Sequence, residues 1–249
     1  MISPDRLIIS VSKKFSGRDI NTYEHPIVIE KQGSAAELVI FLPHRNASRK
    51  FIEKTIKQFK DQHVITFVDG DPMVTDPEKT IDYYNETVSY MMSQIDKLAE
   101  TLKPTSVTII GVSLGCMFAT YIAERIQIPI KQMVLVVGGA SLARSLWEGS
   151  QTQDLKEMYV KQNFDINSLD KLWKSLSPEA HLNFSSVESV SIYLSKADKA
   201  VPYSEGVRLA ELIKKKFPEK TNIHENTYKG HALTILWASK NINDRLLKD

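Results

Sequence analysis

Short apolar runs alternate with longer segments of helical periodicity along most of this 249-residue chain. This alternation is typical of crossover units, in which a helix connects two parallel strands of one sheet. The strand-like runs are 7–11, 27–30, 38–42, 64–68, 106–111, 132–137, 190–194 and 222–228. The pattern therefore predicts an α/β fold with a mostly parallel, eight-stranded sheet flanked by helices.

The composition of individual runs predicts where they lie in that sheet. Runs 106–111 and 132–137 are apolar nearly throughout, as expected of strands that are covered on both faces. The first two runs are joined by more polar sequence that contains the turn residues Ser16 and Gly17. We expect these two runs to form an antiparallel pair at one edge.

The helix between the fourth and fifth runs has the clearest signals. Asp76 can cap free backbone amides, and Pro77 loses no needed donor at a first helical position. Apolar side chains then recur every three or four residues until Pro104, which ends the helix. We assign this stripe to core packing. Further helices are expected at about 47–60, 114–126, 203–217 and 232–247.

Residues 140–186 interrupt the alternation, because they contain no strand-like run and indicate two or three short helices. An insertion of this length in a compact domain is usually a lid or cap. Since the chain has no linker, repeat or low-complexity segment, we expect one domain over residues 1–249 with a cap at about 140–186.

Charge and cysteine content exclude several classes of protein. The 32 basic and 30 acidic residues are interspersed and leave a net charge of +2, which does not indicate a nucleic-acid groove. The single cysteine, Cys116, excludes an internal disulfide and a cysteine-based zinc site. Residues 1–12 lack the apolar stretch of a signal peptide, and the longest apolar runs are too short to span a bilayer. We expect a soluble, cytoplasmic protein with no membrane span.

The sharpest local motif is Gly111, Val112, Ser113, Leu114, Gly115, between a buried strand and a helix. A serine on so sharp a turn lies above the sheet edge, and bulky neighbours two residues away would collide with the turn. Backbone amides at the helix start, such as that of Leu114, can then stabilise an oxyanion. The alternative interpretation is a serine that only caps the helix.

A serine nucleophile needs a base and a carboxylate that orients the base. His231 follows Gly230 after the last strand, and Asp198 follows the seventh strand on the same carboxyl edge as Ser113. The alternatives are a histidine that caps the last helix and an aspartate that closes a turn.

These three motifs, in the order Ser, Asp, His, resemble the α/β-hydrolase family over the chain from Ile27 onward. The resemblance implies an α/β-hydrolase fold with a short helical cap after the sixth strand, where 140–186 stands here. It implies Ser113 as nucleophile, His231 as general base and then acid, and Asp198 as the orienting group. It implies no metal and no organic cofactor.

The loop after the third strand departs from the family pattern of His then Gly, because it contains Pro43, His44, Arg45 and Asn46. Pro43 has no amide to donate, so the second oxyanion donor is expected to be the N–H of His44 or Arg45. We expect Asn46 to cap the next helix. After the fourth strand, Asp69 and Asp71 have too few oxygen ligands nearby for a cation site, and we expect a plain turn there.

The sequence therefore predicts a serine hydrolase that cleaves a carboxylic ester or related acyl substrate of small size through an acyl-enzyme. Trp147 and Trp173 are candidates for lining an apolar pocket under the cap. The alternative for Trp173 is that it only packs against other residues of the cap. His44 and Arg45 give a positive rim that suits anionic substrates. The alternatives are a catalytically silent ligand-binding protein, or an acyltransferase or perhydrolase with the same triad.

Overall fold

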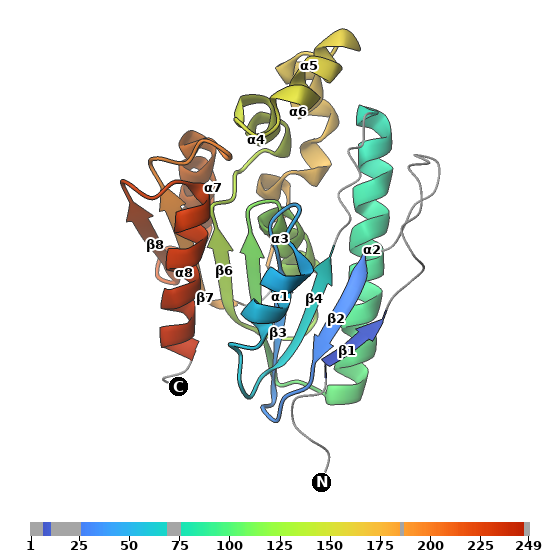
Figure 1. Cartoon of the computed structure of the whole chain (residues 1–249), viewed down its shortest axis with the longest axis vertical. Coiled ribbons are helices and arrows are strands. Elements are labelled where there is room, and N and C mark those ends of the chain that lie inside the picture. The colour runs from blue at the N-terminus through green and yellow to red at the C-terminus, as the bar shows by residue number, and fades with distance from the viewer. Residues whose placement is uncertain (1–6, 11–25, 69–75, 185–186, 247–249) are drawn as a thin grey trace.

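A computed structural model of the chain describes residues 7–10, 26–68, 76–184 and 187–246. Its centre is an eight-stranded sheet in the order β1-β2-β4-β3-β5-β6-β7-β8 (Figure 1). The strands are β1 (Leu7–Ser10), β2 (Ile27–Lys31), β3 (Glu37–Leu42), β4 (His63–Val68), β5 (Ser106–Val112), β6 (Ile130–Val136), β7 (Val187–Ser195) and β8 (Thr221–Asn226). All eight predicted strands are present, with ends that differ by up to three residues.

The predicted antiparallel edge pair is confirmed. β1 pairs antiparallel with β2, and β2 pairs antiparallel with β4, whereas every pairing from β4 to β8 is parallel. Because Leu42 lies opposite Gly111, and Gly111 lies opposite Leu135, the central strands end at the same level. The loops that follow these strands therefore meet at one edge of the sheet.

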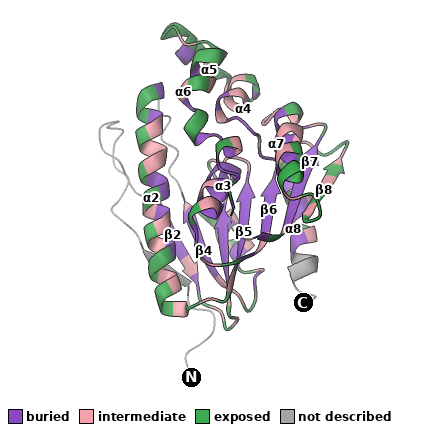
Figure 2. Ribbon diagram, turned by 180° about the vertical axis from the view of Figure 1, so that it is seen from behind, coloured by how far each residue is buried: buried purple, intermediate pink, exposed green. Residues whose placement is uncertain are grey.

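Helices cover both faces of the sheet. The main helices are α1 (Arg49–Ile56), α2 (Pro77–Leu102), α3 (Gly115–Arg125), α7 (Tyr203–Lys216) and α8 (His231–Leu246). Side chains alternate along each central strand between the two faces, as the period of two requires. Leu38, Ile40 and Leu42 belong to the core cluster that contains buried side chains of α2, α3 and α7, whereas Val39 and Phe41 belong to the cluster that contains those of α1 and α8. Figure 2 shows these central strands buried between the two helical layers.

The sequence signals for α2 are confirmed. The side chain of Asp76 accepts hydrogen bonds from the backbone of Glu78 and Lys79, and Pro77 is the first helical residue. Val88, Met91 and Ile95 of the apolar stripe are buried in the core. The helix ends at Leu102, before Pro104.

The expectation for Asn46 is wrong. The side chain of Ser48 accepts from the backbone N–H of Phe51 and is the N-cap of α1. Asn46 instead has φ of 57°, in the left-handed region that asparagine tolerates better than most residues. The helix is also shorter than predicted at both ends, because it begins at Arg49, after the Ser48 cap, and ends at Ile56.

The segment between β6 and β7 forms the predicted helical cap above the carboxyl ends of the strands (Figure 1). Its helices are α4 (Leu142–Glu148), α5 (Gln153–Lys161) and α6 (Ile166–Leu172), followed by the short 3₁₀ turns η1 (Lys174–Leu176) and η2 (Pro178–Ala180). Trp173 ties the cap to α2, because its indole N–H donates to the carbonyl of Pro77 at 2.8 Å. The ring of His181 ties the end of the cap to α3 through Glu124, at 2.7 Å.

Candidate active site

Ser113 occupies a strained turn between β5 and α3. Its φ of 55° lies in the left-handed region, which a residue with a Cβ adopts at an energetic cost. Two backbone hydrogen bonds hold it there: the Ser113 N–H donates to Val136 O at 2.8 Å, and the Cys116 N–H donates to Ser113 O at 2.9 Å. Strain of this kind persists only where the surrounding structure enforces it, as it does at nucleophile turns.

The glycines on either side of this turn are required by close backbone contacts. A Cβ on Gly115 would lie 2.1 Å from Leu42 O, and a Cβ on Gly111 would lie 2.7 Å from Gly115 O. The turn therefore packs directly against the end of β3 and against the first residue of α3. This contact is the physical reason for small residues at 111 and 115.

We expect Gly115→Ala to lower the free energy of unfolding by about 1–3 kcal/mol, measured by denaturant titration. Alanine stabilises a helix interior relative to glycine by up to about 1 kcal/mol. The clash with the carbonyl of Leu42 outweighs this gain, because backbone atoms cannot move away as a side chain can. Gly230→Ala is the matched control, because the atom nearest to its Cβ would be 3.8 Å away. A Gly115→Ala variant as stable as the control would contradict this account of the turn.

Asp198 and His231 form a buried hydrogen-bonded pair. The distance from His231 Nδ1 to Asp198 Oδ2 is 2.7 Å, and the side chains are 15% and 3% exposed, respectively. The other oxygen of Asp198, Oδ1, accepts from the backbone N–H groups of Ala200 and Val201. Since a carboxylate only accepts, Nδ1 of His231 carries the proton and Nε2 is left as an acceptor.

The loop that carries His231 is fixed by a group of polar side chains that sequence reasoning did not identify. The Thr234 hydroxyl lies within hydrogen-bond distance of the carbonyls of Lys229 and Gly230, and Asn226 Nδ2 donates to Thr234 Oγ1. Asn226 Oδ1 also accepts from the Lys229 N–H. These residues hold Gly230 and His231 between β8 and α8.

A cavity of about 460 Å³ lies between the cap and the sheet edge. Ser113, Leu114, His44, Arg45 and His231 all line it, so the structure brings the predicted catalytic and oxyanion residues to one place, with Asp198 hydrogen-bonded to His231. Its volume falls in the range of small-molecule sites.

The two tryptophans considered for an apolar pocket lie in different places. Trp173 lines the cavity and also packs edge-on against Tyr159, with ring centroids 5.5 Å apart. Trp147 is absent from the described residues that line the cavity, and the Nζ of Lys156 lies 5.4 Å from its ring centroid. Trp173 thus both packs within the cap and contacts the cavity.

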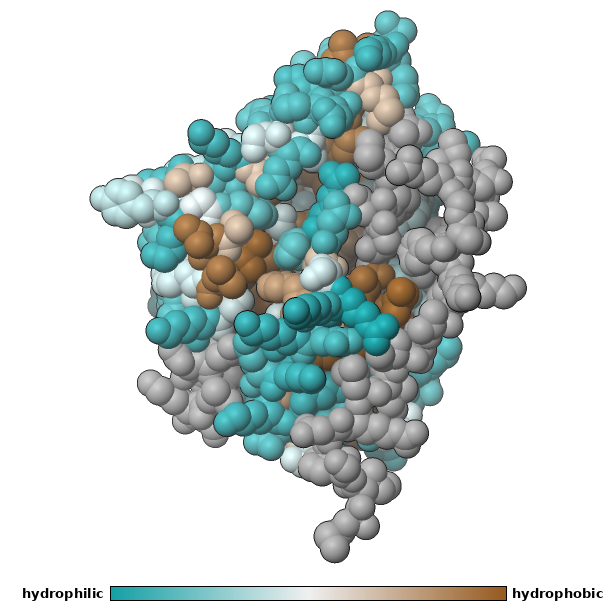
Figure 3. All heavy atoms as spheres, viewed as in Figure 1, coloured by the Kyte–Doolittle hydropathy of each residue, from teal (hydrophilic) through white to brown (hydrophobic). Residues whose placement is uncertain are grey.

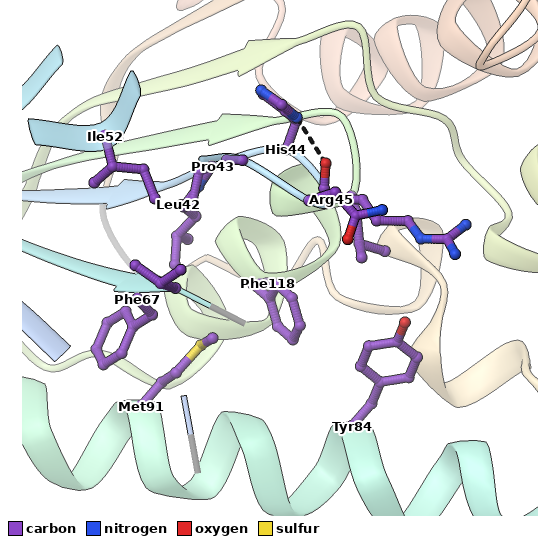
Figure 4. A pocket seen from close by; sticks show the side chains of 13 residues that line it. Leu42, Pro43, His44, Arg45, Ile52, Phe67, Tyr84, Met91 and Phe118 are labelled. Carbon is purple, nitrogen blue, oxygen red and sulfur yellow. Dashed lines mark hydrogen bonds between the residues drawn. The ribbon is translucent and has the colours of Figure 1, made fainter. Parts of the chain in front are cut away.

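The loop after β3 forms one wall of the cavity. His44 Nδ1 donates to the carbonyl of Arg45 at 2.7 Å, and its ring packs on Phe51. The His44 side chain thus stabilises its own loop, which leaves the backbone N–H groups of His44 and Arg45 as the donors to consider. The same loop also borders a separate hollow of about 20 Å³, shown in Figure 4, which is lined mainly by apolar side chains, including Leu42 and Phe67.

Cys116 lies directly beneath the serine turn and is 1% exposed. Its Sγ is 3.2 Å from the carbonyl of Gly111, and burial raises the pKa of the thiol to about 12. Cys116 is thus a small side chain that fills space beneath the turn, and a thiol of this kind is not a nucleophile near neutral pH.

We expect Cys116 to resist iodoacetamide at pH 8 in the folded protein. With a pKa of about 12, about one thiol in 10⁴ is ionised at that pH. Labelling followed by mass spectrometry should be at least about 10³-fold slower than in guanidinium chloride, where the thiol is exposed. Equal rates in the two conditions would show that the thiol is not buried as described.

Among the residues that the structure describes, no group of three or more His, Cys, Asp or Glu side chains is arranged to hold a metal ion. Asp69 and Asp71, for which a plain turn is expected, lie outside the described residues. No helix in the described ranges is both long enough and apolar enough to cross a bilayer.

Comparisons with known proteins agree with this architecture. Residues 72–172 match the model of a family described as alpha/beta hydrolase fold, whereas no curated protein matches the sequence. Similar solved structures include TT1662 of Thermus thermophilus (14% identity, TM-score 0.64), an esterase of Pyrococcus furiosus (15%, 0.61) and an acylaminoacyl peptidase of Pyrococcus horikoshii (10%, 0.59). Each of these likenesses covers about nine-tenths of this chain: 90% for TT1662, 90% for the esterase and 89% for the peptidase. This chain in turn spans 92% of the length of TT1662 and 85% of the esterase, but only 38% of the peptidase. At these identities the likeness shows a shared fold.

Proposed function

Because this chain has the α/β-hydrolase fold, we propose that it is a serine hydrolase that cleaves carboxylic esters or related acyl compounds. Ser113 is the nucleophile, His231 the general base and then acid, and Asp198 the group that orients His231. One observation carries the proposal. The Asp198–His231 pair, with a 2.7 Å hydrogen bond, and the strained Ser113 turn meet at one cavity, although they are far apart in sequence.

The proposed reaction proceeds in two halves. Nε2 of His231 takes the proton of Ser113 Oγ as this oxygen attacks the carbonyl carbon, and the protonated imidazole gives that proton to the departing alcohol. Water then attacks the acyl-enzyme with the same base, and Ser113 is released with the free acid. Asp198 stabilises the imidazolium that forms in each half.

The oxyanion of each tetrahedral intermediate is stabilised by two backbone N–H groups. Leu114 supplies the first, because it directly follows the nucleophile at the start of α3. His44 or Arg45 supplies the second from the loop after β3, and both residues line the same cavity. The short contact between Gly115 and the end of β3 supports this assignment, since it holds the two donor loops together.

The cavity also favours an apolar group on the substrate. Leu142, Leu146 and Leu155 of the cap contribute to its wall, and so do Ala232 and Ile235 of α8. Apolar surface continues outside the cavity over the N-terminal half of α8, where Leu233 and Leu236 are more than half exposed (Figure 3). These surfaces suit the hydrocarbon part of an acyl chain or of an alcohol.

A chain-length series of p-nitrophenyl esters, from acetate to decanoate, tests the proposed function. We expect kcat/KM to rise with acyl length while methylene groups fill the cavity, and then to fall. Product analysis with added alcohol or peroxide separates hydrolysis from transfer and from peracid formation. Failure to turn over any member of the series would contradict hydrolysis and favour a silent ligand-binding protein.

A further inference from the structure

The loops that carry Asp198 and His231 start at the same level of the sheet. β7 and β8 pair in parallel at one edge of the sheet (Figure 1), and Ser195 lies opposite Asn226 where the two strands end. Asp198 lies in the loop after β7, and His231, after the loop that follows β8, is the first residue of α8. Because neither residue belongs to a strand, the pairing of the strands does not by itself fix how the imidazole meets the carboxylate.

The amide of Asn226 connects β7, the loop after β8 and α8. Its Nδ2 donates to the carbonyl of Leu194 at 3.1 Å and to the hydroxyl of Thr234 at 3.0 Å. Its Oδ1 accepts from the backbone N–H of Lys229 at 2.8 Å. A carbonyl only accepts and a backbone N–H only donates, so these partners fix the orientation of the amide. Aspartate could not replace it, because a carboxylate has no proton to donate to either partner of Nδ2.

Two further hydrogen bonds join the start of the acid loop to the histidine loop. The hydroxyl of Ser195, a residue that is 2% exposed, donates to the carbonyl of Lys229 and accepts from the backbone N–H of Ala197 at 3.2 Å. Ala197 directly precedes the carboxylate of the triad. The backbone N–H of Lys196 also donates to the carbonyl of Asn226 at 3.0 Å. The two loops are therefore linked to each other as well as to their own strands.

The hydroxyl of Thr234 attaches the first turn of α8 to this group. Thr234 is 0% exposed, and its Oγ1 lies 2.9 Å from the carbonyl oxygen of Lys229 and 3.0 Å from that of Gly230. The hydroxyl proton can serve either carbonyl, while a lone pair of Oγ1 accepts from Asn226. His231 begins this same turn, so the hydroxyl helps to set the position from which the imidazole reaches its carboxylate.

We propose that Asn226 and Thr234 are positioning residues, which keep Nδ1 of His231 on Asp198 while the imidazole takes and returns the proton of Ser113. This inference rests on the proposed function, since it concerns the same triad. Neither Asn226 nor Thr234 is among the described residues that line the cavity, so both act through His231 and not on the substrate. Loss of the hydrogen bonds between them should therefore lower the rate of the chemical step and leave substrate binding unchanged.

The hydroxyl of Thr234 can be removed without leaving a buried polar group unpaired. In Thr234→Val the amide of Asn226 keeps its bond to β7, and the carbonyl of Lys229 keeps its bond from Ser195. The carbonyl of Gly230 keeps the helical bond from the backbone N–H of residue 234. Since valine also matches threonine in shape, we expect this variant to fold, and its unfolding midpoint checks this. Thr234→Ser is the conservative partner, because it keeps the hydroxyl and removes only a methyl group.

We expect Thr234→Val to lower kcat for p-nitrophenyl esters at least about tenfold with little change in KM, because misplacement of a reacting group by about 1 Å can cost about 100-fold in rate. Asn226→Ala should lower kcat further, and Thr234→Ser should restore it. Ser239→Ala is the matched control with unchanged kcat, since that hydroxyl donates to the carbonyl of Ile235 in the same helix. A kcat within about twofold of wild type in folded Thr234→Val or Asn226→Ala, or equal losses in Thr234→Ser and Thr234→Val, would overturn the inference.

Proton NMR separates failure of this inference from failure of the proposed function, because it needs no turnover. The Nδ1–H of His231, in its 2.7 Å bond to a carboxylate, should give a far-downfield resonance, which is identified by its loss in His231→Gln. We expect this resonance to move upfield or to exchange faster with water in Thr234→Val and Asn226→Ala, but not in Thr234→Ser or Ser239→Ala. If no ester is hydrolysed, the proposed function fails and this resonance decides the inference. An unchanged resonance in Thr234→Val or Asn226→Ala, or its absence from the wild-type spectrum, overturns it.

Discussion

Replacement of Ser113 by alanine should lower kcat for p-nitrophenyl esters by roughly 10³–10⁶-fold. The hydroxyl oxygen is the attacking atom in the proposed reaction, and the nearby Cys116 thiol cannot replace it, because this thiol is buried and has a raised pKa. The loss should be seen in kcat, whereas KM should change little, since alanine removes no group that contacts the rest of the substrate. Steady-state kinetics with the best ester of the series measures both.

The fold should survive this substitution. Alanine can adopt the same left-handed φ, and the backbone hydrogen bonds that hold residue 113 do not involve the hydroxyl. We therefore expect the thermal unfolding midpoint to stay within a few degrees of wild type. Ser89→Ala, at an exposed position on α2, is the control with full activity. A Ser113→Ala protein with more than a tenth of the wild-type kcat would contradict the assignment of the nucleophile.

Replacement of Asp198 by asparagine should lower kcat roughly 10³–10⁴-fold. The backbone N–H groups of Ala200 and Val201 donate to Oδ1 of Asp198, so the oxygen of asparagine will be held in that position. Its NH₂ group then faces His231 Nδ1, where Asp198 Oδ2 now lies. As a donor, this group favours the imidazole tautomer with the proton on Nε2, which cannot accept the proton of Ser113.

The variant is conservative in shape, so a loss of activity can be assigned to the tautomer. Asp82→Asn, at an exposed position on α2, controls for the change in net charge. Circular dichroism and the unfolding midpoint should show that the Asp198→Asn protein is folded. Activity within tenfold of wild type in a folded Asp198→Asn protein would show that this carboxylate does not orient the base.

Local sequence patterns were sufficient to predict the parts of the fold that depend on a single element. The apolar run of β3 and the cap and apolar stripe of α2 each arise from neighbouring residues, so the strands were predicted with small errors at their ends and the main helices with errors of up to four residues. The Ser113 turn is similar, because its two glycines and its position between a buried strand and a helix lie within one short segment. The pairing of Asp198 with His231 followed from a topological rule, since the ends of parallel strands meet at one edge.

Features that depend on contacts between distant elements could not be predicted in the same way. Tyr84 has the spacing of a core residue in α2, and its place beside Arg45 depends on where the loop after β3 ends. The two cap tryptophans look alike in sequence, but Trp173 lines the cavity through contacts with distant residues, Pro77 and Tyr159, whereas Trp147 does not line it among the described residues. Asn46 precedes a helix as a cap residue often does, but the bend that follows Pro43 gives it a left-handed conformation and leaves capping to Ser48.

The central claim is that His231 activates Ser113, and labelling with a fluorophosphonate probe tests it most directly. The probe reacts with an activated serine hydroxyl, and peptide mapping identifies the modified residue. The account predicts one adduct, on the peptide that contains Ser113, and a labelling rate that falls at least about 100-fold in His231→Gln. An unlabelled Ser113 in the wild-type protein, or a rate that does not change in His231→Gln, would contradict it.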